Sequence, residues 1–530
     1  MNGVADGRRN SQGRTERAVL LGASSGALAA ACAALLLPTP LALTVVAVIA
    51  VAEAVGIGVL LVAVSRRAAN VRVREALTRA AAPPVLEPAA PAEDGLLEAR
   101  MRHHDKWKAR LYNGFSATAL EPLLRSARNP RELPEYRFQV LRTLDEWFQA
   151  EERAHEARVE LSVDVLIVSH FGLPGGNTSA NVADITALTG AGLRIGLLHH
   201  PVYRWDVATP LNPKIAELID DDRVVPVSVH DTVRAELTVV RLPTIMERLM
   251  EDLPRIETGR TVLLVNQTPF TFYGEDGGSR EQWSVRGVHE TIRGWLGDHT
   301  WYLIGPEVRA TLERHHGHEL DGLDIADEYW YEIIDAADWV RPERRPESRP
   351  IRIGRHARDA PLKWPETPEK LLACYPDDPE FEVYSLGGAE TPREMLGSLP
   401  GNWVDHPFGS MTAREFLREL DVMVYFIAGE AVEAFGRSPL EAMAVGVPCV
   451  MDPRFEPLFG DGALYCAPDE VAGVIRKLVD EPGAYEAQVA KGFAKIEESF
   501  SPRALVGLVR RLGVDARRTP VSGPPGDGTE

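Results

Sequence analysis

The chain has 530 residues, of which 45% are apolar and 25% are charged, and its formal net charge is −19. These values are typical of a folded protein of two or three domains. The negative charge argues against a nucleic-acid-binding protein, because neutralising phosphates requires a basic surface. The four cysteines have no CxxC spacing, which argues against a zinc site or a disulfide framework and favours a reducing compartment.

The beginning of the chain predicts a transmembrane hairpin at residues 18–64. Residues 18–37 carry no charge and are long enough to cross a bilayer, and residues 41–64 form a second apolar run interrupted only by Glu53. We expect a multi-pass protein of the inner or plasma membrane, and because arginines flank both outer ends, the positive-inside rule predicts that both ends face the cytoplasm. Residues 1–17 and the domains that follow the hairpin would then lie in the cytoplasm. A cleaved signal peptide is the alternative, but it leaves the second run and its basic flank unexplained.

Glu53 is open to two interpretations. It either contacts another helix or a partner, or it is an acid tolerated in a hairpin that packs on itself. Residues 65–160 read as a linker and a helical region. The stretch AAAPPVLEPAAPAEDG (80–95) is rich in Pro and Ala, and residues 96–158 alternate helical patterns with short breaks. We interpret this region as a solvated stalk or as a small cap on the following domain.

The pattern changes to alternating strands and helices after residue 160. Short apolar runs, typical of strands buried on both faces, occur at 163–170, 194–200, 223–229, 236–242, 260–267 and 300–305. Helical segments separate them, which predicts a parallel, doubly wound sheet for residues 161–340.

A charged, Pro-rich stretch at 337–350 marks a boundary, after which the alternation restarts. Strands are predicted at 350–356, 380–388, 401–407, 420–428 and 447–452, and helices near 366–374, 391–398, 411–419, 438–445 and 502–513. The fold class is therefore α/β, with Rossmann-like domains at 161–340 and 341–515 and an inter-domain cleft. The ligand would lie beyond the carboxyl ends of the strands. Residues 516–530 are predicted to be a disordered tail.

The segment EAFGRSPLEAMAVGVPCV (433–450) places Glu433 and Glu441 around a helix start. Ser438 fits the N-cap, Pro439 the first helical position and Glu441 the third, which predicts a capping box, and Gly446 fits the helix end. Capping would be a sufficient structural reason for Glu441.

Glu433 has no such local explanation. It is either an exposed loop acid or a binding residue at the carboxyl edge of the sheet. The backbone N–H groups near Gly436, Arg437 and Ser438 suit a phosphate, and a neighbouring carboxylate suits sugar hydroxyls.

At this segment the sequence resembles the retaining GT-B glycosyltransferases of family 4. The E-x7-E spacing in EAFGRSPLE, followed by AMAVGVPCV, carries the resemblance, which covers about 350–480. It implies that Glu433 binds donor-sugar hydroxyls and that Glu441 lies near the nucleotide ribose; both are our candidate catalytic residues. It also implies that the 161–340 domain takes the acceptor and the 341–515 domain takes the donor.

The resemblance further implies that an Arg and a Lys after the first strand of the donor domain bind the diphosphate. The segment IGRHARDAPLKW supplies Arg355 and Lys363, although with a longer spacing than usual. Two cations at a strand's carboxyl end can neutralise a pyrophosphate, while a solvated basic loop is the alternative. We add Gly436, Arg437 and Ser438 to this diphosphate group.

Two further segments are weaker candidates. The residues His406, Pro407 and Phe408 stand where the family's nucleotide base usually contacts the chain. The loop with Gly175, Gly176 and Asn177 is either a binding loop or a plain tight turn, with Asn177 or Thr178 as a possible helix cap. His199 and His200 end a predicted strand, where a histidine is more often structural than a substrate contact.

These features together predict a membrane-anchored glycosyltransferase of cell-envelope glycan synthesis. It would transfer a sugar from a nucleoside-diphosphate sugar to a lipid-linked or glycan acceptor, with retention. No DxD motif or acidic cluster is placed to hold a metal–diphosphate complex, so we expect metal independence and no cofactor. A GT-B nucleotide-sugar epimerase and a non-catalytic, membrane-tethered scaffold that binds nucleotide sugars are the alternatives.

Overall fold

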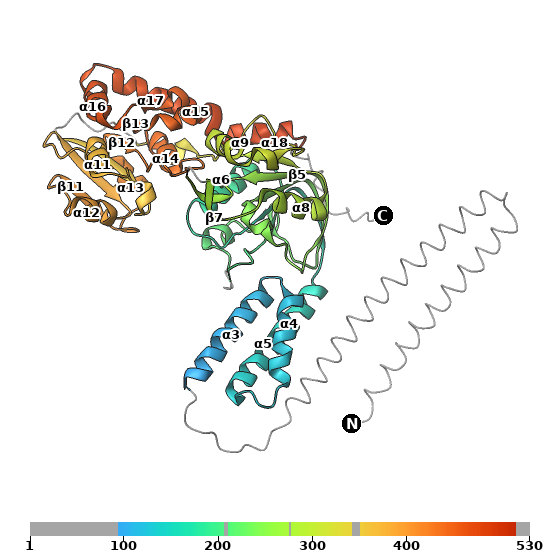
Figure 1. Ribbon diagram of the computed structural model, residues 1–530. Coiled ribbons are helices and arrows are strands. Elements are labelled where there is room, and N and C mark those ends of the chain that lie inside the picture. The colour runs from blue at the N-terminus through green and yellow to red at the C-terminus, as the bar shows by residue number, and fades with distance from the viewer. Residues whose placement is uncertain (1–93, 206–209, 275–276, 342–349, 516–530) are drawn as a thin grey trace, which may run out of the picture. The chain divides into compact units, whose positions relative to one another are not determined.

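A computed structural model describes residues 94–205, 210–274, 277–341 and 350–515 (Figure 1). The predicted hairpin at 18–64 and the predicted tail at 516–530 lie outside these residues. No helix within the described ranges is both long enough and apolar enough to cross a membrane.

The first described elements are three helices, α3 (Asp94–Tyr112), α4 (Ser116–Arg128) and α5 (Pro134–Glu156). The chain divides into one unit of residues 1–97 and 124–142 and a second unit of residues 98–123 and 143–530. In the first unit the turn between α4 and α5 is held by Tyr136, whose hydroxyl donates to Ser126 Oγ at 3.2 Å. In the second unit Ser116 Oγ donates to Asp252 Oδ1 at 2.6 Å.

The second unit contains a six-stranded, fully parallel sheet built from the apolar runs predicted for residues 161–340. Its strands lie in the order β3-β2-β1-β4-β5-β8. The strands are β1 (Glu160–Ser169), β2 (Ile195–His199), β3 (Val224–Pro226), β4 (Thr232–Arg241), β5 (Arg255–Val265) and β8 (Thr300–Leu303). Residues 163–169 of β1 are all buried, as expected of a strand covered on both faces. This doubly wound order reverses beside β1, so the carboxyl ends of β1 and β4 form a switch point.

Helices connect these strands, and one hairpin was not predicted. The helical segments are α6 (Gly176–Gly190), α7 (Pro213–Ala216), η1 (Pro243–Glu247), α8 (Val285–Leu296), α9 (Pro306–Leu320) and α10 (Ala336–Trp339). The hairpin pairs β6 (Phe270–Gly274) with β7 (Gly277–Glu281). Phe272 also forms an isolated antiparallel bridge with Ala431, near the E-x7-E segment. The alternation in FTFYG and the following glycines are a hairpin signal that sequence reasoning missed.

A second six-stranded parallel sheet follows, in the order β11-β10-β9-β12-β13-β14. Its strands are β9 (Ile351–His356), β10 (Phe381–Leu386), β11 (Trp403–His406), β12 (Val422–Tyr425), β13 (Cys449–Met451) and β14 (Leu464–Tyr465). The topology repeats that of the first sheet, so the α/β prediction with two parallel, doubly wound sheets is confirmed. β14 was not predicted, and the inter-domain cleft stays a prediction.

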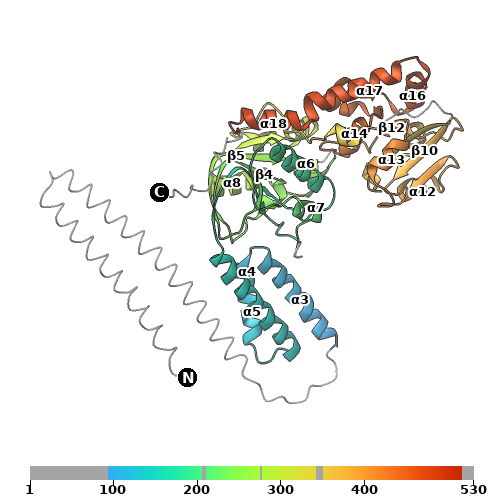
Figure 2. The same cartoon turned by 180° about the vertical axis from the view of Figure 1, so that it is seen from behind.

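The second sheet is connected mainly by short helices. These are η2 (Pro361–Lys363), α11 (Pro368–Cys374), α12 (Glu390–Leu396), α13 (Ala413–Glu419), α14 (Arg437–Val445), α15 (Glu456–Phe459), α16 (Val471–Asp480) and α17 (Ala484–Lys495). A π-helical turn at Ile496–Phe500 then leads into α18 (Pro502–Arg511). Although α18 follows the second sheet in the sequence, it packs against α6 beside the first sheet (Figures 1 and 2).

The start of α14 corrects the predicted capping box. The helix begins at Arg437 with Gly436 as its N-cap, and no side chain caps it. Gly436 has a φ of 86°, a left-handed conformation that glycine adopts without steric cost. Ser438 therefore lies inside the first turn, and its hydroxyl donates to the His356 carbonyl at 2.8 Å instead of capping. The predicted helix end is confirmed, since Gly446 closes α14 with a φ of 86°.

Gly387 lies in the turn after β10, where the main chain packs closely against the loop after β9. Its φ is 116°, and a Cβ would lie 2.0 Å from the Ala357 carbonyl oxygen, whereas a Cβ on Gly397, with a φ of 80°, would meet nothing within 4 Å. Both alanine substitutions carry a left-handed backbone cost of about 1–2 kcal/mol, but only Gly387→Ala adds a clash with main chain. We expect Gly387→Ala to lower the melting temperature clearly more than Gly397→Ala in thermal unfolding followed by circular dichroism. Equal melting temperatures would contradict this packing.

Candidate active site

Three charged residues meet at the carboxyl edge of the second sheet. Arg355 lies on β9, Lys363 ends η2 in the loop after β9, and Glu433 follows β12. Lys363 Nζ forms an ion pair with Glu433 Oε2, and the Tyr425 hydroxyl donates to the same oxygen at 2.8 Å. The parallel order explains this meeting, because β9 and β12 are neighbours and their carboxyl ends share one edge.

Glu433 is a largely buried carboxylate. Its side chain is 17% exposed, so Glu433 is not an exposed loop acid. Burial by itself would raise its pKa, but Lys363, the Tyr425 hydroxyl and Arg355 outweigh burial and hold the pKa of Glu433 below its ordinary value. Both described hydrogen bonds go to Oε2, which leaves Oε1 as the oxygen with no described hydrogen bond.

Arg355 places a buried guanidinium beside this carboxylate. The residue is 1% exposed, Nη1 donates to the Phe426 carbonyl at 3.2 Å, and the guanidinium carbon lies 4.1 Å from the centroid of the Trp364 ring. Nη2 is buried and has no hydrogen-bond partner among the described residues. A buried, unpaired donor on a cation is unfavourable, so this N–H is suited to a ligand oxygen.

The loop that carries Lys363 is held in place by Asp359. The Asp359 carboxylate accepts the indole N–H of Trp364 at 2.9 Å and the backbone N–H groups of Glu390 and Thr391 at 2.5 and 3.1 Å. Although burial raises the pKa of Asp359, these hydrogen bonds lower it below the ordinary value overall. The loop after β9 is thereby tied to the start of α12, which orders the segment that carries Lys363.

The predicted site residues Gly436, Arg437, Ser438 and Glu441 lie at the start of α14. The Glu441 side chain is 12% exposed; Oε1 accepts from Arg437 Nε at 3.0 Å, and Oε2 lies 3.3 Å from His356 Nε2. Arg437 also donates to Glu332 at 3.2 Å. The guanidinium of Arg437 therefore lies between two carboxylates, while Gly436 and Ser438 contribute the backbone of the first turn.

The predicted base-binding residues lie on the same sheet edge but apart from this cluster. His406 ends β11, and its ring stacks on Tyr384 with centroids 6.1 Å apart. Its carbonyl accepts the Gly387 N–H at 2.9 Å. Pro407 is exposed, and Phe408 is 78% exposed. The structure describes no hydrogen bond from these three residues to Arg355, Lys363 or Glu433.

The glycine loop of the first sheet forms the start of α6. Gly175 is the N-cap with a φ of 87°, and no side chain caps the helix, so the caps considered at Asn177 and Thr178 were wrong. Asn177 Nδ2 instead donates to the His170 carbonyl at 3.2 Å, and Asn177 Oδ1 accepts from Asn266 Nδ2 at 3.4 Å. A Cβ on Gly175 or Gly176 would meet nothing within 4 Å, so packing does not require these glycines.

Histidines gather at the carboxyl ends of β1 and β2. Nδ1 of His170 accepts the Gly172 N–H at 3.2 Å, and Nδ1 of His199 accepts the Phe171 N–H at 3.1 Å, with ring centroids 5.0 Å apart. Both neutral rings therefore carry their proton on Nε2. Burial, with smaller effects of its histidine neighbours, lowers the pKa of His199 to about 3, and burial also lowers the pKa of His170. Both are neutral hydrogen-bond donors at pH 7.

His200 differs from these two histidines because it is structural. It is fully buried, and its Nε2 accepts the Met250 N–H at 3.0 Å. Burial lowers its pKa to about 4.

Sequence reasoning missed several side chains of this region. His170, His356 and Tyr425 stand at or next to the carboxyl end of a strand, so the same rule that selected Arg355 could have found them. Trp364 and Glu332 carried no local signal, because their roles come from partners that are distant in the sequence.

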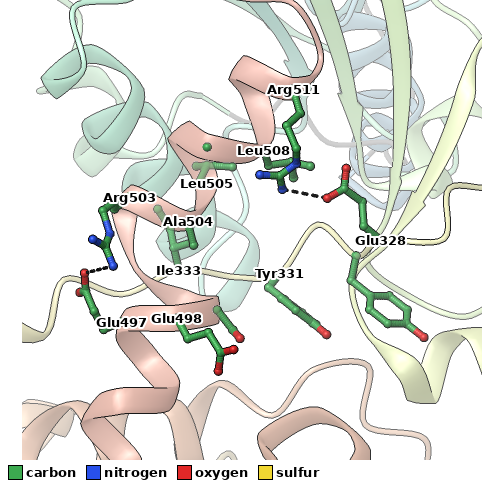
Figure 3. A pocket seen from close by; sticks show the side chains of 13 residues that line it. Glu328, Tyr331, Ile333, Glu497, Glu498, Arg503, Ala504, Leu505, Leu508 and Arg511 are labelled. Atoms are coloured by element: carbon green, nitrogen blue, oxygen red, sulfur yellow. Dashed lines mark hydrogen bonds and ion pairs between the residues drawn. The ribbon is translucent and has the colours of Figure 1, made fainter.

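A cavity of about 410 Å³ lies elsewhere in the second unit (Figure 3). One wall is formed by Glu328, Tyr329, Tyr331 and Ile333, and the other by side chains of the π-helical turn and α18. None of the predicted site residues lines it. The candidate site is therefore defined by the charged cluster on the sheet edge.

The distribution of metal-ligating side chain types bears on the metal prediction without testing it. Within residues 94–205, 210–274, 277–341 and 350–515, no three His, Cys, Asp or Glu side chains group as metal ligands would. Metal independence stays a prediction.

Comparison with known proteins finds similar solved structures only. No family model matches the chain, and no curated protein sequence matches it. A crystal structure of a Staphylococcus aureus TarM variant with fondaparinux, α-GlcNAc-glycerol and UDP is 14% identical, with a TM-score of 0.39, and covers 56% of this chain. This chain spans 57% of the length of that TarM chain.

Two other similar structures are named as a glycosyltransferase and as an O-GlcNAc transferase. A glycosyltransferase from Rickettsia africae is 10% identical with a TM-score of 0.44, covering 67% of this chain and 99% of its own. The pneumococcal O-GlcNAc transferase GtfA, in complex with UDP and GlcNAc, is 12% identical with a TM-score of 0.34 and covers 52% of this chain and 56% of its own. At these values the chemistry has to be inferred from the side chains of this protein.

The lowered pKa of Glu433 has a consequence for stability. The ionised carboxylate stabilises the folded state fully above the ordinary carboxyl pKa near 4.5, and this contribution is lost as the pH falls through the lower folded pKa. We expect Glu433→Gln to melt at a lower temperature than the wild type at pH 7, with the difference shrinking below pH 4.5. The exposed Glu430→Gln is the control, for which no such pH-dependent difference is expected. A difference that is constant from pH 7 to pH 3 would contradict the ion pair.

Proposed function

We propose that the protein is a membrane-anchored glycosyltransferase that moves a sugar from a nucleoside-diphosphate sugar to a lipid-linked or glycan acceptor, with retention of configuration. The observation that carries the proposal is the cluster of Arg355, Lys363 and Glu433 at one sheet edge. Two cations beside one buried, ionised carboxylate suit a ligand that presents a diphosphate and hydroxyl groups together.

The cations and the start of α14 suit the donor diphosphate. Arg355 Nη2 is a buried donor without a described partner, and the side chain of Lys363 is 32% exposed. Backbone N–H groups of the first turn of α14 add a positive dipole end. As the bond between the sugar C1 and the diphosphate oxygen breaks, negative charge develops on that oxygen, and these groups stabilise it.

Glu433 suits the hydroxyl groups of the transferred sugar. Lys363 and Tyr425 hold Oε2, so Oε1 keeps a fixed direction as a charged acceptor. In the proposed transfer the acceptor oxygen bonds to C1 on the face that the diphosphate leaves, and the acceptor proton passes to the leaving phosphate oxygen. No covalent nucleophile from the protein is needed, and positioning supplies most of the acceleration.

The carboxyl edge of the first sheet suits the acceptor. His170, His199 and Asn177 present neutral imidazole and amide groups there. Neutral groups that donate and accept hydrogen bonds match hydroxyl groups without favouring an anion. The anchoring part of the proposal rests on the apolar runs at 18–64.

A thermal-shift screen tests the donor site. UDP, GDP, dTDP, ADP and their common sugar conjugates are added to the wild type, and we expect one nucleotide family to raise the melting temperature by mass action. Lys363→Met is expected to weaken diphosphate binding by about tenfold to a hundredfold, because a charge-assisted hydrogen bond contributes about 1.5–3 kcal/mol. Glu433→Gln is expected to abolish only the extra stabilisation that the sugar conjugate adds.

Arg358→Met is the matched control for this screen. Arg358 is an exposed cation of the same loop, and its replacement should leave the shifts unchanged. If Arg358→Met and Lys363→Met reduce the thermal shifts equally, the shifts depend on the overall charge of the loop and not on a contact made by Lys363. The absence of a shift with any nucleotide would contradict the proposal.

The stereochemical outcome tests transfer with retention. The sugar conjugate identified by the screen is incubated with the protein and a glycan or lipid-linked acceptor, and the anomeric coupling of the product is read by proton NMR. We expect the product to keep the anomeric configuration of the donor. Isomerised donor formed without any acceptor would favour the epimerase, and donor that binds but is never consumed would favour the scaffold.

A further inference from the structure

Residues 328–333 belong to the chain between β8 and β9 and are called the linker from here on; their side chains alternate between two different surroundings. Tyr329, Tyr331 and Ile333 line the cavity, and Tyr331 and Ile333 are labelled in Figure 3. The two residues between them point elsewhere: Trp330 Nε1 lies 3.4 Å from Asp184 Oδ2 on α6, and Glu332 accepts a hydrogen bond from Arg437 on α14. Such alternation is typical of an extended segment.

Arg437 joins this linker to residues 433–450, the segment with Glu433 and α14, which is called the donor segment from here on. Its Nη1 donates to Glu332 Oε2 at 3.2 Å and to the Ile333 carbonyl at 3.4 Å. Its Nε donates to Glu441 Oε1 at 3.0 Å. One guanidinium thus holds a carboxylate of the linker and a carboxylate of α14, two residues that are 109 positions apart in the chain.

Arg437 is a cationic partner of both carboxylates, which are largely buried. The side chains of Glu332 and Glu441 are each 12% exposed, and that of Arg437 is 18% exposed. Burial raises the pKa of Glu332, against the opposing effect of Arg437 and Arg241. Burial alone would lower the pKa of Arg437, but Glu332 and Glu441 raise it above its ordinary value. Arg437 is therefore charged, and two largely buried acids share it as a partner.

The same contacts limit what Arg437 can offer a ligand. Gripping a phosphate bidentately requires two neighbouring N–H groups on one edge of the guanidinium. Nε is engaged by Glu441 and Nη1 by Glu332 and Ile333, so each two-donor edge already has an engaged member. This arrangement does not fit the diphosphate role that the sequence suggested for Arg437.

We propose that Arg437 is a positioning residue that acts through Glu441, and that its ion pair with Glu332 makes the geometry of the donor site depend on the linker between the two sheets. This inference rests on the proposed function, because it assigns a role within the same nucleotide-sugar site. Glu441 touches the ligand, Arg437 fixes the direction of the Glu441 carboxylate, and Glu332 fixes Arg437.

The experiment compares ligands with and without phosphate. The dissociation constants of UDP, GDP, dTDP and ADP and of the four matching nucleosides are measured by calorimetry and ligand-observed NMR. Arg437→Lys and Arg437→Met are compared with the wild type. Lysine keeps a positive charge that can bind a phosphate. Its ammonium group lacks the planar set of N–H donors with which the Arg437 guanidinium contacts two carboxylates at once. We expect both variants to weaken the recognised nucleoside and its diphosphate by the same factor, about tenfold.

A direct phosphate contact gives a different pattern. Arg437→Lys would then bind the diphosphate nearly as well as the wild type, and Arg437→Met would weaken the diphosphate while leaving the nucleoside unchanged. Either result overturns the proposal. A wild type that binds none of the four diphosphates contradicts the proposed function itself, which keeps the two failures distinguishable.

Glu332→Gln tests whether the linker contributes to the geometry of the donor site. It also keeps the proposal testable if Arg437→Met does not fold. Glutamine keeps the size and the acceptor oxygen of Glu332 but removes its charge, so a smaller loss, about threefold, is expected for nucleoside and diphosphate alike. Glu332 is proposed to act only through Arg437. The double variant Glu332→Gln, Arg437→Lys should therefore weaken nucleotide binding by less than the product of the two single-variant factors. A double variant that weakens binding by the full product of the two single-variant factors would overturn the proposed coupling.

The matched control is another ion pair of the same linker. Glu328 accepts from Arg511 of α18 at 2.8 Å, and this pair does not touch the donor segment. Glu328→Gln should leave every dissociation constant unchanged. If it weakens binding as much as Glu332→Gln does, the effect belongs to the linker in general and the proposal fails.

Discussion

Buried carboxylates require cationic partners, and this requirement arranges the carboxyl edge of the second sheet. Glu433 is held by Lys363 and lies beside Arg355, while Glu441 is held by Arg437. Removing one partner of such a pair leaves an uncompensated buried charge, which is strongly destabilising. The loops after β9 and β12 and the start of α14 are therefore constrained together, and the same contacts that hold them keep Glu433 ionised.

The two sheets share one strand order but present different chemistry at their carboxyl edges. The second sheet presents Arg355, Lys363 and Glu433, which are charged groups in a largely buried setting. The first sheet presents His170 and His199, whose pKa values are lowered by burial so that both rings are neutral. Under the proposed function this difference separates the charged donor from an acceptor that is recognised through hydroxyl groups.

The linker and the aromatic residues behind it connect the donor segment to the rest of the second unit. Phe435, between Glu433 and α14, packs against Tyr331 of the linker and against Phe500 of the π-helical turn, with ring centroids 6.3 and 5.5 Å apart. Tyr331 also forms part of the cavity wall. The donor segment thus contacts the linker through the ring of Phe435 and through the ion pair of Arg437 with Glu332, so a shift of the linker changes both contacts.

Local patterns in the sequence determined the helices and strands and several of the residues at the carboxyl edge of the second sheet. Sequence patterns indicated every strand of the two sheets except β14. Strands such as β1 and β12 were indicated by nearly continuous apolar runs, because a strand covered on both faces needs such residues. Gly446 predicted the end of α14, since a left-handed residue there favours glycine. Arg355 and Glu433 could be selected because strand ends in a parallel sheet share one edge.

Only the tertiary structure decided which polar groups pair. Ser438 and Glu441 had the spacing of a capping box, but the His356 carbonyl takes the Ser438 hydroxyl, and Arg437 takes Glu441. Glu332, the other partner of Arg437, lies 105 positions away in the chain, a distance that no local pattern records. A short-range hydrogen bond can be read from neighbouring residues, but it competes with every partner that folding brings near, and the winning partner is set by burial and charge.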